Sequence, residues 1–372
     1  MNLDFTSEQD ILRDSARKFL SKECPYARVK ELEESEAGYD ARLWAKMAEL
    51  GWLGWLFPEA YGGFDGEFTD LVIIQEEIGR AAYPSPFFST VIQSGLVILE
   101  GGSEDQKTEL LSGIAEGGLL MALAQYEEEA SYLASGIQMK AVLQDGAWVL
   151  NGTKLFVLDA NVADKLLVVA RAGDQGPTLF LVDAKDPGLT ITKMPAIGKD
   201  NNCEVVFQDV KTAESDVIGP VGGAWEILEK MNVKASVAKA AEMVGGCKVC
   251  IDITAAYAKE REQYGHPIGG YQAIQHYMAN MLLAHDTANA FLYKVASMID
   301  EGADASTEAS VVKACANENF KFVSERAVQI HGGIGTTREG DIGLFYRRAK
   351  AFEYVSGDTD HHYEKVAQAL LD

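Results

Sequence analysis

The sequence has little positive charge relative to negative charge, few cysteines and no long uninterrupted apolar run. It contains 33 Lys and Arg against 56 Asp and Glu, a formal net charge of −23 over 372 residues. A surface this acidic repels nucleic-acid phosphate and anionic lipid, so neither is an expected partner. Any anionic ligand must therefore be bound by a few local cations and backbone amides.

The N-terminal segment lacks the features of a targeting sequence. "MNLDFTSEQDILRDSARKFL" has acidic residues early and no apolar h-region, so it indicates neither a signal peptide nor a transmembrane span. We expect a cytoplasmic protein. The five cysteines are an odd, scattered set, which suits reduced thiols. Cys247 and Cys250 form the one close pair, and because no second pair or His accompanies them at ligand spacing, no metal site is expected.

The chain does have enough apolar residues for two or three domains without disulfides, since 47% of its residues are hydrophobic. Its first third follows a helical period. Thr6 is predicted to cap the first helix, with Gln9 at the capping-box spacing. Further helices are predicted at 41–50, 70–81 and 93–99.

The middle of the chain changes to short β-branched runs separated by Gly, Asp and Asn, such as "KLLVVARA" and "CEVVFQDV". They predict a small antiparallel sandwich or barrel, with a hairpin turn at "QDGAW". Long helical periods return and predict helices at 225–259, 271–299 and 309–331. We predict an α+β fold with an N-terminal helical domain (1–118), a middle antiparallel β domain (119–222) and a C-terminal bundle of the four-helix type (223–372).

Three motifs follow one another in this helix–sheet–helix order. They are "YAKEREQYGHPIGGYQAIQH" at 257–276, "VQIHGGIG" at 328–335 and "YRRAKAFEYVSGDTDHH" at 346–362. Together they resemble the acyl-CoA dehydrogenase family, and the likeness runs over essentially the whole chain. The "GDTDHH" ending is similar to the smaller subunits of two-subunit members such as pimeloyl-CoA dehydrogenase. The resemblance implies FAD, α,β-desaturation of an acyl-CoA, electrons passed to an electron-transfer flavoprotein, and a homo- or hetero-oligomer.

The same resemblance implies a set of FAD contacts. Arg261 would face the FAD diphosphate, where a guanidinium can form two parallel charge-assisted hydrogen bonds. Tyr264 would pack beside the adenosine end, and Gln272 would contact it from the following turn. Backbone amides would approach the same diphosphate near four further residues, because glycine has no Cβ in the way: Gln329, Gly332, Gly333 and Gly335.

Ordinary structural roles compete with these assignments. A helical arginine usually pairs with a carboxylate three or four positions away, but no carboxylate stands at those positions around Arg261; they hold Tyr257, Ala258, Tyr264 and Gly265. A glycine pair after a helix, as at Gly332 and Gly333, is often an ordinary C-cap.

The catalytic carboxylate that the resemblance implies is missing. In the family a carboxylate, whose pKa burial raises, removes the substrate α-proton from the position of Ser356 or of Ala235. Ser236 stands where some members carry an arginine near the substrate. Asp358, two residues beyond Ser356, is a candidate for a displaced base, and Asp360 is a second.

The flavin-ring side also departs from the family pattern. "YEEEASYL" at 126–133 replaces Thr-Glu-Pro-Gly-x-Gly-Ser-Asp, and Phe156-Val157-Leu158 replaces Trp-x-Thr. Phe156 can cover a flavin ring or be an ordinary core aromatic. Glu127, Glu128 and Glu129 are expected to form a solvated acidic run.

Three hypotheses remain open at this point. The leading one is a subunit of a heteromeric acyl-CoA dehydrogenase, in which a second acyl-CoA dehydrogenase-like subunit supplies the base. A self-sufficient enzyme with Asp358 as base, or a different flavin-fold reaction such as elimination from a β-position, is the second. A non-catalytic structural subunit is the third. The acyl group stays open in all of them.

Overall fold

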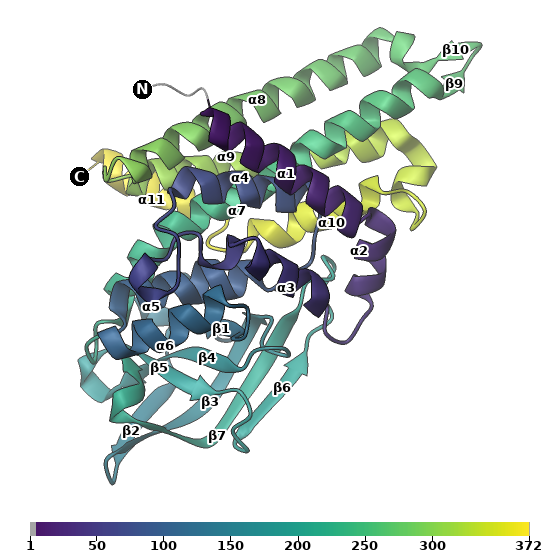
Figure 1. Cartoon of the computed structure of the whole chain (residues 1–372). Coiled ribbons are helices and arrows are strands. Elements are labelled where there is room, and N and C mark those ends of the chain that lie inside the picture. The colour runs from purple at the N-terminus through teal and green to yellow at the C-terminus, as the bar shows by residue number, and fades with distance from the viewer. Residues whose placement is uncertain (1–4, 372) are drawn as a thin grey trace. The chain divides into compact units, whose positions relative to one another are not determined.

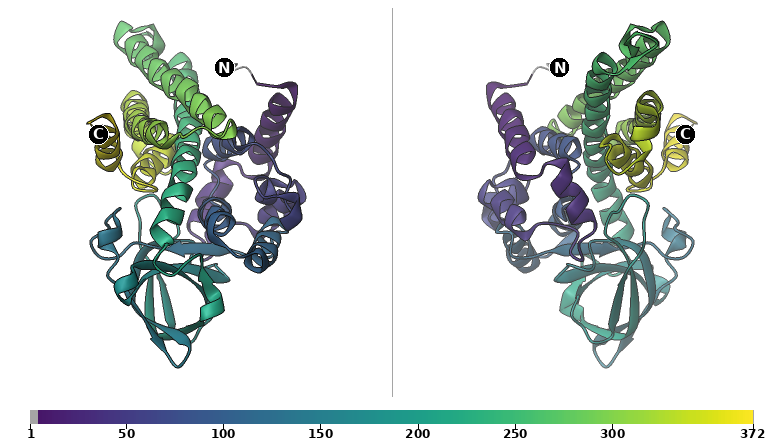
Figure 2. Two further views of the ribbon diagram at one scale, coloured as in Figure 1. Left: turned by 90° about the vertical axis from the view of Figure 1, so that its left-hand side faces the viewer. Right: turned by 90° about the vertical axis from the view of Figure 1, so that its right-hand side faces the viewer.

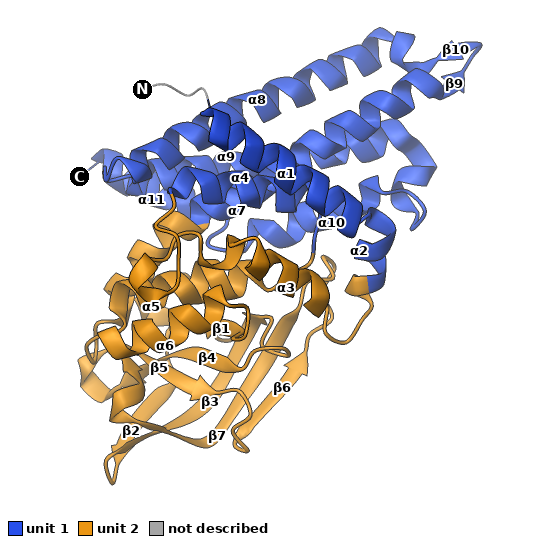
Figure 3. Cartoon of the chain, in the orientation of Figure 1, with its two compact units in different colours: residues 1–31, 67–83, 236–372 blue, residues 32–66, 84–235 orange. Residues whose placement is uncertain are grey.

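The computed structural model describes residues 5–371 (Figure 1). It divides into two compact units, shown in Figure 3. Unit 1 consists of residues 1–31, 67–83 and 236–372, and unit 2 of residues 32–66 and 84–235. Helix α7 (Ala224–Glu260) begins in unit 2 and continues into unit 1. None of the helices within residues 5–371 is long and apolar enough to cross a membrane.

Unit 1 is helical and is organised around α9 (Ser306–His331). This helix packs against α8, α10 and α11. The first helix begins as predicted, because Thr6 and Gln9 form both hydrogen bonds of a capping box. The other helices of this unit are α1 (Ser7–Glu23), α4 (Phe68–Ala81), α8 (Gln272–Asp300), α10 (Ile342–Glu353) and α11 (Thr359–Leu371), while α2 (Tyr26–Glu33) lies at its boundary.

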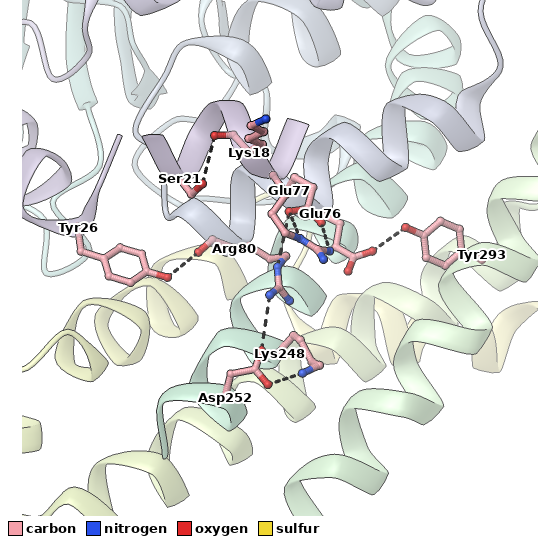
Figure 4. Close-up of polar contacts among 10 residues, drawn as sticks. Lys18, Ser21, Tyr26, Glu76, Glu77, Arg80, Lys248, Asp252 and Tyr293 are labelled. Atoms are coloured by element: carbon pink, nitrogen blue, oxygen red, sulfur yellow. Dashed lines mark hydrogen bonds and ion pairs between the residues drawn. The ribbon is translucent and has the colours of Figure 1, made fainter. Parts of the chain in front are cut away.

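Two features join the helices of unit 1. A Cβ built on Gly79 of α4 would lie 2.0 Å from the carbonyl oxygen of Glu242 on α7, so only glycine permits this close crossing. The Arg17 guanidinium of α1 donates to both carboxylate oxygens of Glu77 at 3.0 and 2.6 Å. Figure 4 shows Glu77 beside Arg80, whose Nε lies 3.6 Å from the same carboxylate. Burial raises the pKa of Glu77, while Arg17 opposes that shift. The bidentate Arg17–Glu77 pair therefore stabilises the docking of α1 on α4.

Unit 2 carries a mixed sheet in the order β6-β7-β3-β2-β4-β5-β8, with β1 paired to β4. Figure 2 shows these strands curving around one another. The apolar core of the sheet includes Leu150, Val168, Phe180 and Phe207. Most pairings are antiparallel as predicted, but β1–β4 and β2–β4 are parallel. The strands are β1 (Met121–Ala124), β2 (Lys140–Gln144), β3 (Ala147–Leu158), β4 (Lys165–Ala172), β5 (Pro177–Asp183), β6 (Leu189–Lys193), β7 (Asn202–Ala213) and β8 (Val217–Ile218).

The local predictions for unit 2 are confirmed at the hairpin and refined in the helices. Asp145 and Gly146 both have positive φ, 52° and 79°, as a tight turn between β2 and β3 requires. The predicted helix at 41–50 is α3 (Ala41–Glu49). The predicted helix at 93–99 is a π-helix (Phe88–Gly95) that runs into α5 (Leu96–Gly101), and α6 (Glu104–Ala115) follows.

Candidate functional site

Arg261 directly follows α7 and opens a short hairpin, β9 (Glu262–Gln263) and β10 (His266–Pro267). Its backbone is fixed, because its amide donates to the Tyr257 carbonyl at 2.8 Å and its carbonyl accepts from the Ile268 amide at 2.8 Å. Its side chain is exposed and forms no hydrogen bond or ion pair with any of residues 5–371. An exposed guanidinium on a fixed backbone is suited to binding an anion from outside the chain.

The other two residues predicted near Arg261 also lie at the surface. Tyr264 is at the tip of the hairpin, has a φ of 54° and is 94% exposed. Gln272 is the first residue of α8, and it is exposed as well. An aromatic ring this exposed has no packing role within the described chain, which favours an intermolecular one.

The end of α9 forms a cleft of about 340 Å³. Its lining includes Gln329, Gly332 and Gly333, together with Glu325, Val328, Thr336 and Tyr346. Gly332 has a φ of 64° and is the C-cap of α9, so the ordinary structural role applies to it. It does not apply to Gly333, which has no positive φ and where an added Cβ would meet no atom within 4 Å. Nothing in residues 5–371 therefore requires glycine at 333, whereas a ligand approaching the backbone would.

His331 links this cleft to the end of α7. Its ring stacks on Tyr257 with centroids 4.4 Å apart, and its Nδ1 donates to the Ala327 carbonyl at 2.8 Å. Burial lowers the pKa of His331, which favours the neutral ring. Tyr257 lies one helical turn before Arg261, so the structure brings the helix ends that carry the first two motifs together.

Phe156 lies in unit 2, on β3, at a bulge between Lys154 and Val157. Its φ of 55° is unusual for an aromatic residue, and its side chain is 43% exposed. The alternative that Phe156 is an ordinary core aromatic is therefore wrong. Strained backbone of this kind persists where surrounding structure holds it, often at functional sites.

The expected solvated acidic run is wrong for Glu127. Its carboxylate accepts from the buried Lys154 ammonium at 2.6 Å and from the backbone amides of Gln138 and Met139. Burial lowers the pKa of Lys154 to about 8, against the opposing effect of Glu127. Glu128 and Glu129 are exposed, as expected. The Glu127–Lys154 pair therefore ties the 125–139 loop to the bulge that carries Phe156.

The candidate base positions lie in different surroundings. Ala235 is fully buried. Ser356 lies in the turn between α10 and α11, is 7% exposed and has a φ of 60°. The Asp358 carboxylate accepts from the His361 amide at 2.9 Å, at the start of α11, so a helix-capping role accounts for this side chain. Asp360 is exposed in the first turn of α11.

Models of the acyl-CoA dehydrogenase N-terminal, middle and C-terminal domains match residues 6–118, 122–210 and 225–371. The chain belongs to the acyl-CoA dehydrogenase family. It is therefore an oxidoreductase that acts on acyl-CoA, in a family whose members are flavoproteins.

Individual relatives match over their whole length. The chain is 31% identical to a probable acyl-CoA dehydrogenase of Bacillus subtilis, with 100% of both chains covered. It is 29% identical to a caffeyl-CoA reductase-Etf complex subunit of Acetobacterium woodii, with 99% of both covered. Among solved structures, butyryl-CoA dehydrogenase from Megasphaera elsdenii superposes with a TM-score of 0.92 at 28% identity, covering 100% of both chains.

Two residues of the site escaped prediction from sequence. Lys313 and His362 are buried on α9 and α11, and both contact the turn that carries Ser356. Lys313 stands within the apolar pattern "SVVKACANENF", where a lone lysine is an unusual core residue. That interruption was the available signal.

Proposed function

We propose that this chain is an FAD-binding subunit of an acyl-CoA dehydrogenase that is completed by a second acyl-CoA dehydrogenase-like subunit. The observation that carries the proposal is a contrast between two sets of residues. The Arg261 side chain is exposed without a partner among residues 5–371, and Gln329 and Gly333 line an open cleft. In contrast, no carboxylate stands at Ser356 or Ala235. Such a chain can contribute to a flavin site without supplying the base.

The residues present fit the diphosphate of FAD. Arg261 offers a planar pair of N–H donors, and Gly333 leaves its backbone open to a ligand. Because the formal net charge is −23, local donors of this kind are needed for an anionic cofactor to bind. Bound FAD supplies a hydride acceptor for the substrate β-carbon. Phe156, which is exposed on β3, would cover a flavin ring.

The proton acceptor for the α-carbon is assigned to the partner subunit. In this chain Asp358 is engaged in capping α11, and the hydroxyl of Ser356 is too weak a base to replace a carboxylate. The proposed role of an electron-transfer flavoprotein is supported by the Acetobacterium woodii relative, whose name places it in a complex with Etf. That name also describes a reductase, so the preferred direction of the reaction is part of the test.

The test is to purify the chain alone and together with a partner encoded beside it, and to record flavin absorbance. We expect substantial FAD only in the joint preparation. An acyl-CoA should bleach the flavin there, or an enoyl-CoA should reoxidise it if the enzyme works as a reductase. A chain that binds FAD and is bleached when purified alone would contradict the proposal in favour of a self-sufficient enzyme. Absence of flavin from both preparations would favour a structural subunit.

A further inference from the structure

The turn between α10 and α11 is fixed by a buried lysine. The ammonium of Lys313, which is 0% exposed, donates to the carbonyl oxygens of Gly357 at 3.0 Å, Glu353 at 3.2 Å and Phe352 at 3.3 Å. Its Nζ also lies 2.6 Å from Oδ1 of Asn317, so three ammonium hydrogens are shared among four acceptors. One side chain from α9 thus binds both the end of α10 and the turn beyond it.

The surroundings of Lys313 explain how a buried ammonium is tolerated. Within residues 5–371 it forms no ion pair with a carboxylate, and its contacts are neutral oxygens. Phe352 and Glu353 carry the last carbonyls of α10, where the helix dipole concentrates negative charge. Burial and the nearby Lys239 lower the pKa of Lys313 well below its usual value. This is a costly arrangement that stabilises one conformation of the turn.

The backbone of Ser356 is held from two further sides. Its carbonyl accepts from Nε2 of His362 at 2.9 Å and from Oγ of Ser236 at 3.3 Å. Because a carbonyl can only accept, Nε2 of His362 carries the proton. A Cβ on Gly357 would lie 2.6 Å from that nitrogen, so glycine is needed here. Ser356 is consequently kept in the left-handed region, which is unfavourable for serine.

The side chain of Ser356 differs from its carbonyl in hydrogen bonding. Its Oγ is buried and has no hydrogen-bond partner among the described residues. Nδ1 of His362 and Nδ2 of Asn317, in the same cluster, also lack one. Buried polar atoms in folded proteins almost always have a partner. A fixed backbone beneath an unpartnered side chain is the arrangement expected where the partner is a ligand.

We propose that Lys313 is a positioning residue, which holds the 352–357 segment so that the Ser356 hydroxyl meets a polar group of the bound acyl thioester. The proposal rests on the proposed function, because it assumes that an acyl-CoA binds at this turn. Lys313 acts through the turn, since its described contacts are with the turn, α10 and Asn317. The hydroxyl contributes a hydrogen bond to binding and does not remove the α-proton.

The test uses the flavin-loaded assembly with butanoyl-CoA as probe and a double-mutant cycle of Lys313→Met and Ser356→Ala. Val312→Ala is the matched control, because Val312 is the fully buried neighbour of Lys313 on the same helix and its truncation lowers stability without removing the ammonium. Three quantities are measured for each variant: the Kd of butanoyl-CoA, the thermal midpoint, and amide exchange in residues 354–358.

Ser356→Ala should weaken butanoyl-CoA binding about two- to tenfold while leaving the thermal midpoint unchanged or higher, because it deletes a buried hydroxyl that has no partner. A purely structural role would not separate these two quantities. Lys313→Met should weaken binding at least as much and speed exchange of residues 354–358 about tenfold or more. In the double variant the two losses should not add, since both act through one contact. Val312→Ala should lower the midpoint only.

Three results would overturn the inference. The first is an unchanged Kd in Ser356→Ala, which would mean that the hydroxyl binds an internal water only. The second is additive losses of affinity in the double variant. The third is unchanged amide exchange in Lys313→Met. Wild-type assembly that binds flavin but no acyl-CoA would overturn the placement of the thioester. Wild-type protein that takes up no flavin with any partner would instead overturn the proposed function. In that case amide exchange in Lys313→Met would still test whether Lys313 holds the turn.

Discussion

The end of α9 and the turn after α10 lie in the same helical unit but are built in opposite ways. The Arg261 side chain has no partner among the described residues, and an added Cβ at Gly333 would meet no atom within 4 Å. Around Ser356, backbone carbonyls are bound by Lys313, His362 and Ser236, while the Ser356 hydroxyl has no partner among the described residues. The first region is suited to a large anionic ligand from outside. The second is suited to a small, fixed contact.

The largest expected effect is at Arg261. Arg261→Ala should weaken FAD binding by the assembly by about 1.5–3 kcal/mol, the value of one charge-assisted contact, without lowering the thermal midpoint of the apoprotein. Flavin content after dialysis measures the loss. Arg42→Ala is the control, because Arg42 is an exposed arginine of unit 2 that pairs with the nearby Asp40. Equal flavin retention in both variants would remove Arg261 from the cofactor site.

Acid should destabilise the chain through His362, whose ring binds the Ser356 carbonyl. Burial, followed by the charge of Lys313, lowers the pKa of His362 to about 3 from its ordinary 6.5. Between these values the unfolded chain binds more protons than the folded one, so stability is complete above pH 6.5 and falls as the pH drops toward 3. The slope should be at most about 1.4 kcal/mol per pH unit for this group.

Replacing His362 by Gln should flatten that slope in denaturant titrations across the same pH range. His266→Gln is the control, because His266 is an exposed residue of the β9–β10 hairpin. A profile that His362→Gln leaves as steep as the wild type would show that the imidazole is not kept neutral by burial.

Exposed apolar side chains on the β9–β10 hairpin and on α8 predict assembly. Tyr264 is 94% exposed and Leu283 of α8 is 67% exposed. We expect a homo- or hetero-oligomer in sedimentation at micromolar concentration, because such side chains are favoured at interfaces. A single folded chain sedimenting alone under those conditions would count against a flavin site that is shared between chains.

The smallest expected effect is at Asp358. Asparagine caps helices as well as aspartate does, so Asp358→Asn should change stability by only a few tenths of a kcal/mol and turnover of the assembly by less than about threefold. Steady-state kinetics with the bound partner measure this. A loss of about a hundredfold or more, with flavin and acyl-CoA binding intact, would identify Asp358 as the base.

The sequence predicted the elements well where a strong period decides them. Helices α8 and α9 begin and end within a few residues of the predicted limits, because their apolar stripes are long and their ends are marked by Gly302 and Gly332. The parallel pairing of β1 with β4 was not predictable, since strand order depends on contacts between distant segments.

The site was predictable only where a motif marks it. Arg261 and Gly333 belong to recognisable motifs, but the exposure of Arg261 and the open space around Gly333 can be known only from the structure. The sequence predicted Glu127 to be part of a solvated acidic run. Its partner Lys154 lies 27 residues away, and no local pattern identifies it. Lys313 was missed because its acceptors are backbone carbonyls, which carry no sequence signature.

The most direct test of the central claim is anaerobic mixing of an acyl-CoA with the chain purified alone and with the chain purified with its partner, each supplied with FAD. Flavin absorbance is followed in both. The account predicts that the flavin of the joint preparation is reduced, and that the chain alone shows no reduction because it has no carboxylate at Ser356 or Ala235. Rapid bleaching of flavin in the chain alone would contradict it.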